Sequence, residues 1–101
     1  MASRVDLQYK LEELLGSRQV YYQPPETVKM EYPAIVYSKN RIDSTFANDA
    51  SYLTAKQYEI IVISKSPDNV VIDKILRLPM CTYNRHYKSN NLNHDVLTLY
   101  F

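Results

Sequence analysis

One short stretch constrains the fold of this chain more than any other: Lys56–Ser64, with the sequence KQYEIIVIS. Through its centre, Ile60–Ile63, apolar side chains occupy both sets of alternating positions. Because successive side chains of a strand point to opposite faces, this centre is apolar on both faces. The pattern therefore predicts a strand inside a sheet rather than at its edge.

Two segments have helical patterns. The first is Ser3–Gly16, with Ser3 as the N-cap, the glycine as the C-terminal stop and Asp6 near the positive helix end. Its leucines form one apolar stripe: Leu7, Leu11, Leu14 and Leu15. The second is Ser66–Pro79, where Ser66 is expected to cap the helix and Pro67 to take the first helical position.

The remaining strand patterns define the fold class. They are Gln19–Gln23, Ala34–Asn40, Cys81–Tyr87 and Asn93–Phe101, and the last two flank the hairpin signal KSNN. The order α-β-β-β-α-β-β predicts an α+β fold, with a mainly antiparallel sheet of about five strands and two packing helices. A length of 101 residues favours one domain, residues 1–101. The predicted core residues are Leu11, Ile61, Val62, Ile75 and Leu97.

The segment Arg41–Ala55 separates two of these strands. It is polar, rich in turn-forming residues and too long for a tight hairpin, so we expect a projecting loop or a long, twisted two-stranded arm. We hypothesise that Phe46 packs against a neighbouring subunit or another protein on assembly; alternatively, it folds back onto its own core. The candidate interface residues are Arg41, Asp43, Phe46, Asn48, Asp49 and Tyr52.

The composition excludes several classes of protein. A single glycine, Gly16, is incompatible with glycine-rich phosphate loops, which removes most nucleotide enzymes. Twelve basic and eleven acidic residues give a net charge of +1, so bulk charge does not direct the chain to nucleic acid or anionic lipid. Ten tyrosines suit half-buried strands and protein interfaces.

The single cysteine and the short apolar runs indicate the kind of cellular compartment in which the protein is found. Cys81 has no partner for an internal disulfide, and we expect it to be a small buried hydrophobe. No apolar run approaches the ~18 residues of a membrane span, and the opening sequence MASRVDLQYK lacks a signal-peptide core. We expect a reducing, soluble compartment, or a particle assembled there.

Both histidines, His86 and His94, lie near the final hairpin. If Asn90–Asn91 is a two-residue turn, Tyr87 opposes His94 and His86 opposes Asp95; a longer loop would place Arg85 opposite His94 instead. In neither register do the imidazoles face each other, so a metal site would lack converging ligands. A His86–Asp95 pair would still need a nucleophile, and none is recognisable. We therefore predict no catalytic residues, no metal and no cofactor, and a protein that is not an enzyme.

Two segments, YSKNR (Tyr37–Arg41) and YNRHYK (Tyr83–Lys88), interleave aromatic and basic residues, as platforms for single-stranded nucleic acid do. A small α+β module that binds nucleic acid or a small ligand is therefore an alternative reading.

The chain as a whole resembles the small tail terminator, or tail completion, proteins of long-tailed bacteriophages. The resemblance covers nearly the full length and rests on the element order and three segments. These are VYYQPPETVKMEYPAIVYSKN, KQYEIIVISKSPDNVVIDKILRLP and HYKSNNLNHDVLTLYF. The related head-closure proteins of the phage neck are also small and similar.

The resemblance implies a structural role in the virion, at the neck end of the tail. Such proteins form a ring, usually a hexamer, on the last ring of the tail tube, stop tube polymerisation and dock to the head connector. DNA passes through the ring without specific binding. The family also implies that the arm Arg41–Ala55 takes part in ring contacts or faces the tube, where Asp43 and Asp49 would repel phosphate. Assembly would take place in the bacterial cytoplasm, without a membrane.

Overall fold

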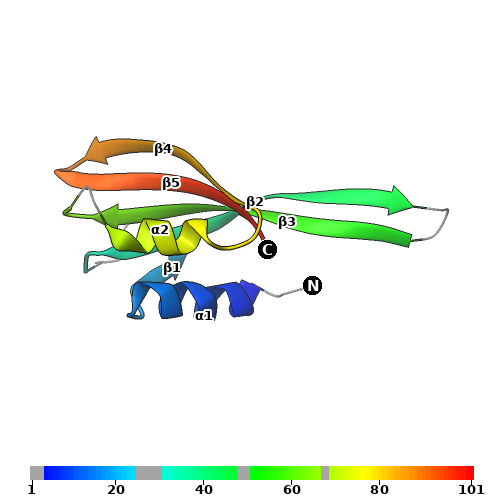
Figure 1. Ribbon diagram of the computed structural model, residues 1–101, viewed down its shortest axis with the longest axis horizontal. Coiled ribbons are helices and arrows are strands. Elements are labelled where there is room, and N and C mark those ends of the chain that lie inside the picture. Colours follow the sequence, from blue (N-terminus) through cyan, green and yellow to red (C-terminus); the bar gives the residue numbers. More distant parts are fainter. Residues whose placement is uncertain (1–3, 25–30, 48–50, 67–68) are drawn as a thin grey trace.

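The structure is a computed structural model that describes residues 4–24, 31–41, 56–66 and 69–101 in full and the backbone of 42–47 and 51–55. Within these residues two helices and five strands occur in the predicted order (Figure 1). Their bounds are α1 Arg4–Leu15, β1 Val20–Tyr22, β2 Ala34–Ala47, β3 Ser51–Ser64, α2 Val70–Leu76, β4 Cys81–Ser89 and β5 Leu92–Tyr100.

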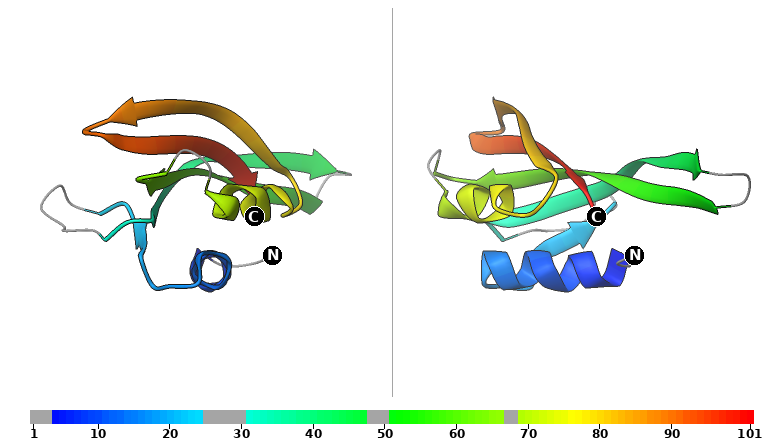
Figure 2. Two further views of the ribbon diagram at one scale, coloured as in Figure 1. Left: turned by 60° about the vertical axis from the view of Figure 1, so that its left-hand side comes forward. Right: turned by 45° about the vertical axis from the view of Figure 1, so that its right-hand side comes forward.

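The five strands form one sheet in the order β1-β2-β3-β5-β4. β1 pairs with β2 in parallel, and the other three pairs are antiparallel. Both helices lie on the same face of the sheet, and no described helix covers the other face (Figure 2). The predicted α+β fold with a mainly antiparallel sheet is therefore confirmed.

Helix α1 follows from its leucine stripe. Leu7 and Leu11 are completely buried, and Leu14 and Leu15 pack against the same core. Gly16 ends the helix with φ of 80°, a backbone conformation that costs glycine little, and its N–H donates to the carbonyl of Glu12 at 2.9 Å. The predicted stop is confirmed, while the predicted cap Ser3 lies outside the described residues.

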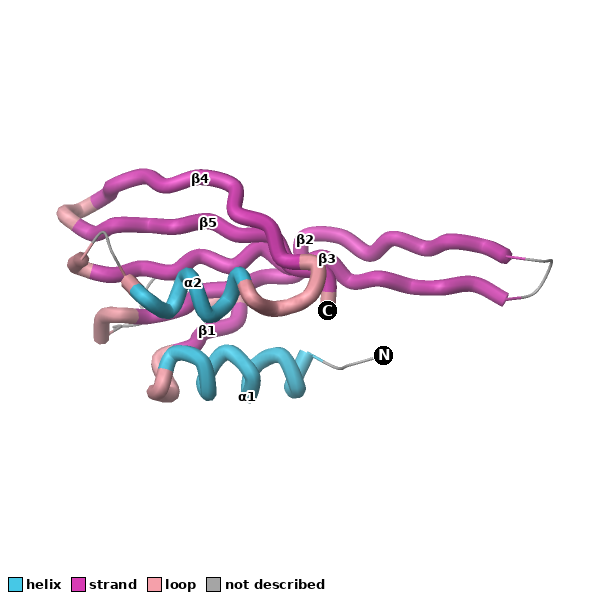
Figure 3. Tube along the Cα trace, viewed as in Figure 1, coloured by secondary structure: helices cyan, strands magenta, loops and turns pink. Residues whose placement is uncertain are grey.

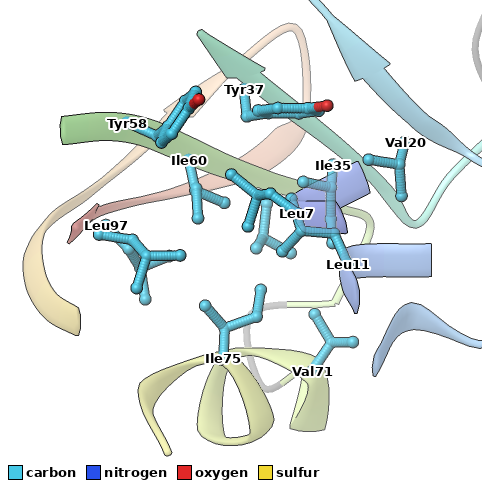
Figure 4. Close-up of a cluster of buried hydrophobic side chains, with 12 residues drawn as sticks. Leu7, Leu11, Val20, Ile35, Tyr37, Tyr58, Ile60, Val71, Ile75 and Leu97 are labelled. Carbon is cyan, nitrogen blue, oxygen red and sulfur yellow. The ribbon is translucent and has the colours of Figure 1, made fainter. Parts of the chain in front are cut away.

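Strand β3 lies at the centre of the sheet, as its apolar pattern predicts. Tyr58, Ile60 and Val62 are buried on the face that carries the helices. In Figure 4 their neighbours from both helices and from β1, β2 and β5 point into one cluster. The predicted core residues Leu11, Val62, Ile75 and Leu97 are each fully buried, which confirms them.

Ile61 departs from the prediction, because it is only half-buried. Its neighbours Ile60 and Val62 point into the helix-covered face, so the side chain of Ile61 lies on the opposite face. There it stands between Val36 and Val96, its register partners on the two adjacent strands. An apolar pattern on both faces of a strand identifies a central strand, but it does not tell which face the helices cover.

The N-cap of helix α2 lies three residues after the predicted one. Asn69 is the N-cap, and its side-chain oxygen accepts a hydrogen bond from the N–H of Val71 at 2.9 Å. The carbonyl of Ser66 instead accepts from the hydroxyl of Ser64, and Pro67 lies outside the described residues. Ser66 as the cap was therefore wrong: asparagine is an equally good capping residue and stands next to the first turn.

The final hairpin closes on Asn90 and Asn91, which both have positive φ, 51° and 63°. These angles are those of a two-residue type I′ turn, whose twist matches the flanking strands. The observed register pairs Tyr87 with His94 and His86 with Asp95, so the two-residue alternative is confirmed.

Candidate assembly interface

A two-stranded arm projects from the body of the molecule (Figures 1 and 3). It is formed by the outer parts of β2 and β3, whose paired positions run from Arg41–Gln57 to Ala47–Ser51. Of the two alternatives for Arg41–Ala55, the arm is therefore right. It makes the molecule elongated, with extents of 52 × 25 × 23 Å.

The arm begins where the sheet narrows. Among the described residues β1 pairs with β2 only as far as Tyr37, and β5 pairs with β3 only from Gln57 onward. Beyond these positions the ribbon has two strands and no third described strand at either edge. A two-stranded ribbon is marginally stable in water by itself, and its edges present backbone groups to any strand that approaches.

A hydrogen-bond network holds the root of the arm. The register of β2 and β3 shifts between Lys39 and Arg41, and the side chain of Asn40, at this bulge, donates to Gln57 Oε1 at 2.6 Å. Gln57 is buried and donates to the hydroxyl of Tyr100 at 2.8 Å. Arg41 donates to the same hydroxyl at 3.0 Å. The last strand is thereby tied to both strands of the arm at the point where it leaves the sheet.

The six predicted interface residues lie in different parts of the arm, and two of them lie outside the described residues. Arg41 lies exposed at the root, where it bonds Tyr100, rather than at the tip. Asp43 is paired with Ala55 along the arm, and Phe46 and Tyr52 occupy directly opposed positions near its end. Asn48 and Asp49 lie outside the described residues.

Strand β4 is a second candidate surface, which the sequence analysis did not identify as a protein interface. It forms an edge of the sheet, and from Thr82 to Ser89 every residue is exposed. Exposed large side chains lie along it and just before it: Met80 at 69%, Tyr83 at 44% and Tyr87 at 36%. Tyrosine, methionine and arginine are the residues that protein interfaces favour.

Basic and aromatic groups continue along this edge. The guanidinium of Arg85 lies 5.5 Å from the ring centre of Tyr87, a cation–π distance. Tyr87 in turn stacks on His94 of β5, with ring centres 4.7 Å apart and planes inclined by 12°. Val96, two residues after His94, is the register partner of Ile61, which lies on the sheet face without helices. Because side chains two residues apart in a strand point to the same face, His94 and its register partner Tyr87 stack on that face.

The histidines do not converge. His86 Nε2 lies 3.1 Å from Asn93 Oδ1, and His94 Nδ1 donates to the carbonyl of Leu92 at 3.1 Å. Asp95 opposes His86 in register, but its Oδ1 accepts a hydrogen bond from the hydroxyl of Tyr83 at 2.7 Å. Within the described parts of the chain, no three histidine, cysteine or carboxylate side chains gather as metal ligands would.

Asp95 is a buried carboxylate, 4% exposed, and its second oxygen has no hydrogen-bond partner within the described chain. The hydrogen bond to Asp95 raises the pKa of Tyr83, because the phenol would lose the proton that it donates to this bond. Cys81 is half-buried, and burial raises the pKa of its thiol. A raised pKa leaves little thiolate at neutral pH, which disfavours a nucleophilic role.

Comparison with protein-family models gives no match, and comparison with curated protein sequences gives none either. Neither of the described helices has the length and hydropathy that a membrane span requires.

Proposed function

We propose that this chain is a structural assembly protein of the tail terminator type. It forms a ring, a hexamer by the family resemblance, on the head-proximal end of a phage tail tube. The ring ends tube polymerisation and joins the tail to the head connector. Its partners are other copies of itself, the tail tube protein and a head-closure or connector protein, and its place is the neck of the virion.

The observation that carries the proposal is the arm. Six paired positions, Ile42–Lys56 to Ala47–Ser51, extend beyond the rest of the sheet, and the bulge lies at their root. The root is fixed by the bonds that converge on Tyr100, so the arm leaves the body in a defined direction. A ribbon that is marginal alone but firmly anchored gains stability by lying against another protein. Ring subunits and a tube end supply such a surface.

The charge of the chain fits the proposed lumen. A ring through which DNA passes must not hold the phosphates, and twelve basic against eleven acidic residues provide no strong net attraction. The near-neutral net charge supports the proposal whichever face of the chain lines the channel.

The test uses the tail tube protein of the virus that encodes the chain. Tubes are polymerised with increasing amounts of the purified chain and examined by electron microscopy. We expect shorter tubes, each with an extra ring at one end. Binding to the head connector without any effect on tubes would instead assign the chain to head closure, and failure to bind either would refute the virion role.

A specific observation favours a second candidate, a module that binds single-stranded nucleic acid. The stack of Arg85, Tyr87 and His94 offers flat rings beside a positive charge, which is how such modules hold bases. Fluorescence anisotropy with a labelled single-stranded oligonucleotide tests this candidate. Binding that is lost in Tyr87→Ala and weakens with salt would support it.

A further inference from the structure

The two edges of the sheet differ in what covers them (Figure 2). At one edge, β1 has only three residues, and the side chain of Gln8 in helix α1 donates to the carbonyl of Val20 at 2.9 Å. At the other edge, β4 has nine residues, and no hydrogen bond between described residues reaches its outer side. Alternate residues of an edge strand direct both backbone groups outward, so β4 offers donors and acceptors to an approaching strand.

The second half of β4 is the regular part of this edge. The register with β5 shifts between Tyr83 and Arg85, and from Arg85 to Ser89 it runs without interruption to the turn. Every residue of this stretch is exposed. The stretch has an ordinary strand length and spans roughly 17 Å at about 3.4 Å per residue. An extended segment of similar length can therefore add to the sheet here.

This stretch presents positive charge on both of its faces. Arg85 shares the sheet face without helices with Tyr87, and Lys88 lies on the opposite face, because side chains alternate along a strand. No described carboxylate forms an ion pair with either cation. Asp95 on the neighbouring strand is buried, and its Oδ1 accepts a hydrogen bond from Tyr83. A strand along this edge is therefore favoured if it carries carboxylates opposite Arg85 and Lys88.

The spacing of the two cations defines the segment that fits. The positions opposite Arg85 and Lys88 in an added strand are three residues apart, and Tyr87 lies between them. The matching segment has two acidic residues at this spacing, on opposite faces, with an apolar residue between them to contact the tyrosine ring. No two of the eleven acidic residues of this chain stand three positions apart. The chain itself does not supply such a segment.

We propose that the edge Arg85–Ser89 of β4 binds an extended acidic segment of a different protein, which adds to the sheet as a further strand. Its backbone pairs with β4, and its two carboxylates bind Arg85 and Lys88 on opposite faces. The positive charge also opposes pairing of two copies through this edge, since their cations would meet. The inference goes beyond the proposed function, because the contact requires neither a ring nor a tube.

A peptide fits this edge better than single-stranded DNA does. The DNA backbone has hydrogen-bond acceptors but no donors, so it cannot pair with the backbone carbonyls of β4. Laid on the stack of Arg85, Tyr87 and His94, DNA would meet the cation on that face and not Lys88. An extended peptide alongside the strand reaches both cations.

The probe is a fluorescein-labelled peptide, Thr-Thr-Glu-Val-Val-Glu-Thr-Thr, whose glutamates have the required spacing in either strand direction. Its binding to the full chain is measured by fluorescence anisotropy. The matched peptide Thr-Thr-Glu-Val-Glu-Val-Thr-Thr has the same composition, but both of its glutamates lie on one face of a strand. We expect the first peptide to bind about threefold more tightly, because only this peptide can pair with both cations.

Charge reversal on the protein provides a second measurement. Arg85→Glu with Lys88→Glu should weaken binding of the first peptide about tenfold, since two attractions become repulsions. The same variant should gain binding of Thr-Thr-Lys-Val-Val-Lys-Thr-Thr, which shows that its edge is still folded. The control is Arg18→Glu with Lys74→Glu, an equal change of charge at exposed positions away from β4. It should leave the affinity for the first peptide within about twofold.

Hydrogen exchange separates strand addition from charge attraction alone. With the first peptide bound, alternate backbone amides of Arg85–Ser89 should exchange about tenfold more slowly, while those of Lys10–Glu13 in α1 should not change. Equal binding of the two glutamate peptides, no gain of binding by the lysine peptide, or binding without slower exchange in β4 would overturn the proposal. Displacement of the first peptide by a single-stranded oligonucleotide that binds more tightly would also overturn it, in favour of the nucleic-acid module.

The tube assay of the proposed function gives an independent result. Capped tubes formed by a chain that does not bind the acidic peptide would leave the proposed function intact and remove this inference. Peptide binding at β4 without any effect on tubes would remove the proposed function alone.

Discussion

At the scale of single residues, Ile60 and Ile61 are neighbours in β3 with opposite surroundings. Ile60 is fully buried under the helices, whereas Ile61 is half-buried on the face without them. We expect Ile60→Ala to lower the free energy of unfolding by about 2–5 kcal/mol, because it leaves a cavity. Ile61→Ala should cost about 1 kcal/mol, since less apolar area is lost. Urea denaturation of both variants measures the difference, and equal losses would contradict this account of the two faces.

Tyr37 has a buried hydroxyl with two partners. It donates to Gln8 Oε1 at 2.5 Å and accepts from Arg4 at 3.3 Å, and Tyr37 is 1% exposed. Burial raises its pKa, and the guanidinium of Arg4 partly opposes this. Because the pKa of this phenol is higher in the folded state than in the unfolded state, its proton stabilises the fold. The stabilisation is complete at pH values below the unfolded pKa of about 10, and it is lost as the pH rises through the folded pKa.

Tyr37→Phe should therefore lower the free energy of unfolding by about 1–2 kcal/mol at neutral pH, because the polar partners lose a hydrogen bond. The difference from the unaltered protein should shrink above about pH 10, since phenylalanine does not ionise. Denaturation curves at neutral pH and at about pH 11 provide the measurement. A difference that grows with pH would contradict the direction of the pKa shift.

At the scale of elements, local patterns predicted most of the fold. The leucine stripe that ends at Gly16, the apolar centre of β3 and the residues Asn90–Asn91 all encode their structures within a few positions. Helix α2 shows the limit of such patterns, because Ser66 and Asn69 are both good capping residues and the local sequence does not select between them. Local sequence patterns could not predict that β4 forms an exposed edge, because this depends on β5 lying between β3 and β4 in the sheet.

The turn at Asn90–Asn91 allows a prediction for an element. Glycine adopts positive φ without steric cost, and Asn-Gly is the preferred pair for a type I′ turn. We expect Asn91→Gly to leave the free energy of unfolding unchanged or raise it by about 0.5 kcal/mol, and Asn91→Val to lower it by about 1–2 kcal/mol. Thermal unfolding of the two variants compares them directly. A tolerated valine would mean that the turn adopts another conformation.

At the scale of the whole molecule, the arm enlarges the dimensions of the monomer. The radius of gyration over Cα atoms is 14.7 Å, whereas a compact chain of this length has about 13 Å. Replacing Ser44–Thr54 by Asn-Gly should lower the radius of the monomer to about 13 Å. The melting temperature should stay within about 3 °C of the original, because the core and the bonds to Tyr100 remain. X-ray scattering and calorimetry test the two parts, and unfolding would show that the arm belongs to the core.

The strand order has a consequence for biosynthesis. β5, the last of the five strands to leave the ribosome, lies between β3 and β4 and pairs with both. Until Leu92–Tyr100 have emerged, the apolar strand β3 has an unpaired edge and β4 lacks the one described strand with which it pairs. A nascent chain in this state is open to wrong strand pairing. Folding of this sheet must therefore wait until translation has passed Tyr100, and the arm stays unanchored for the same interval, since Tyr100 holds its root.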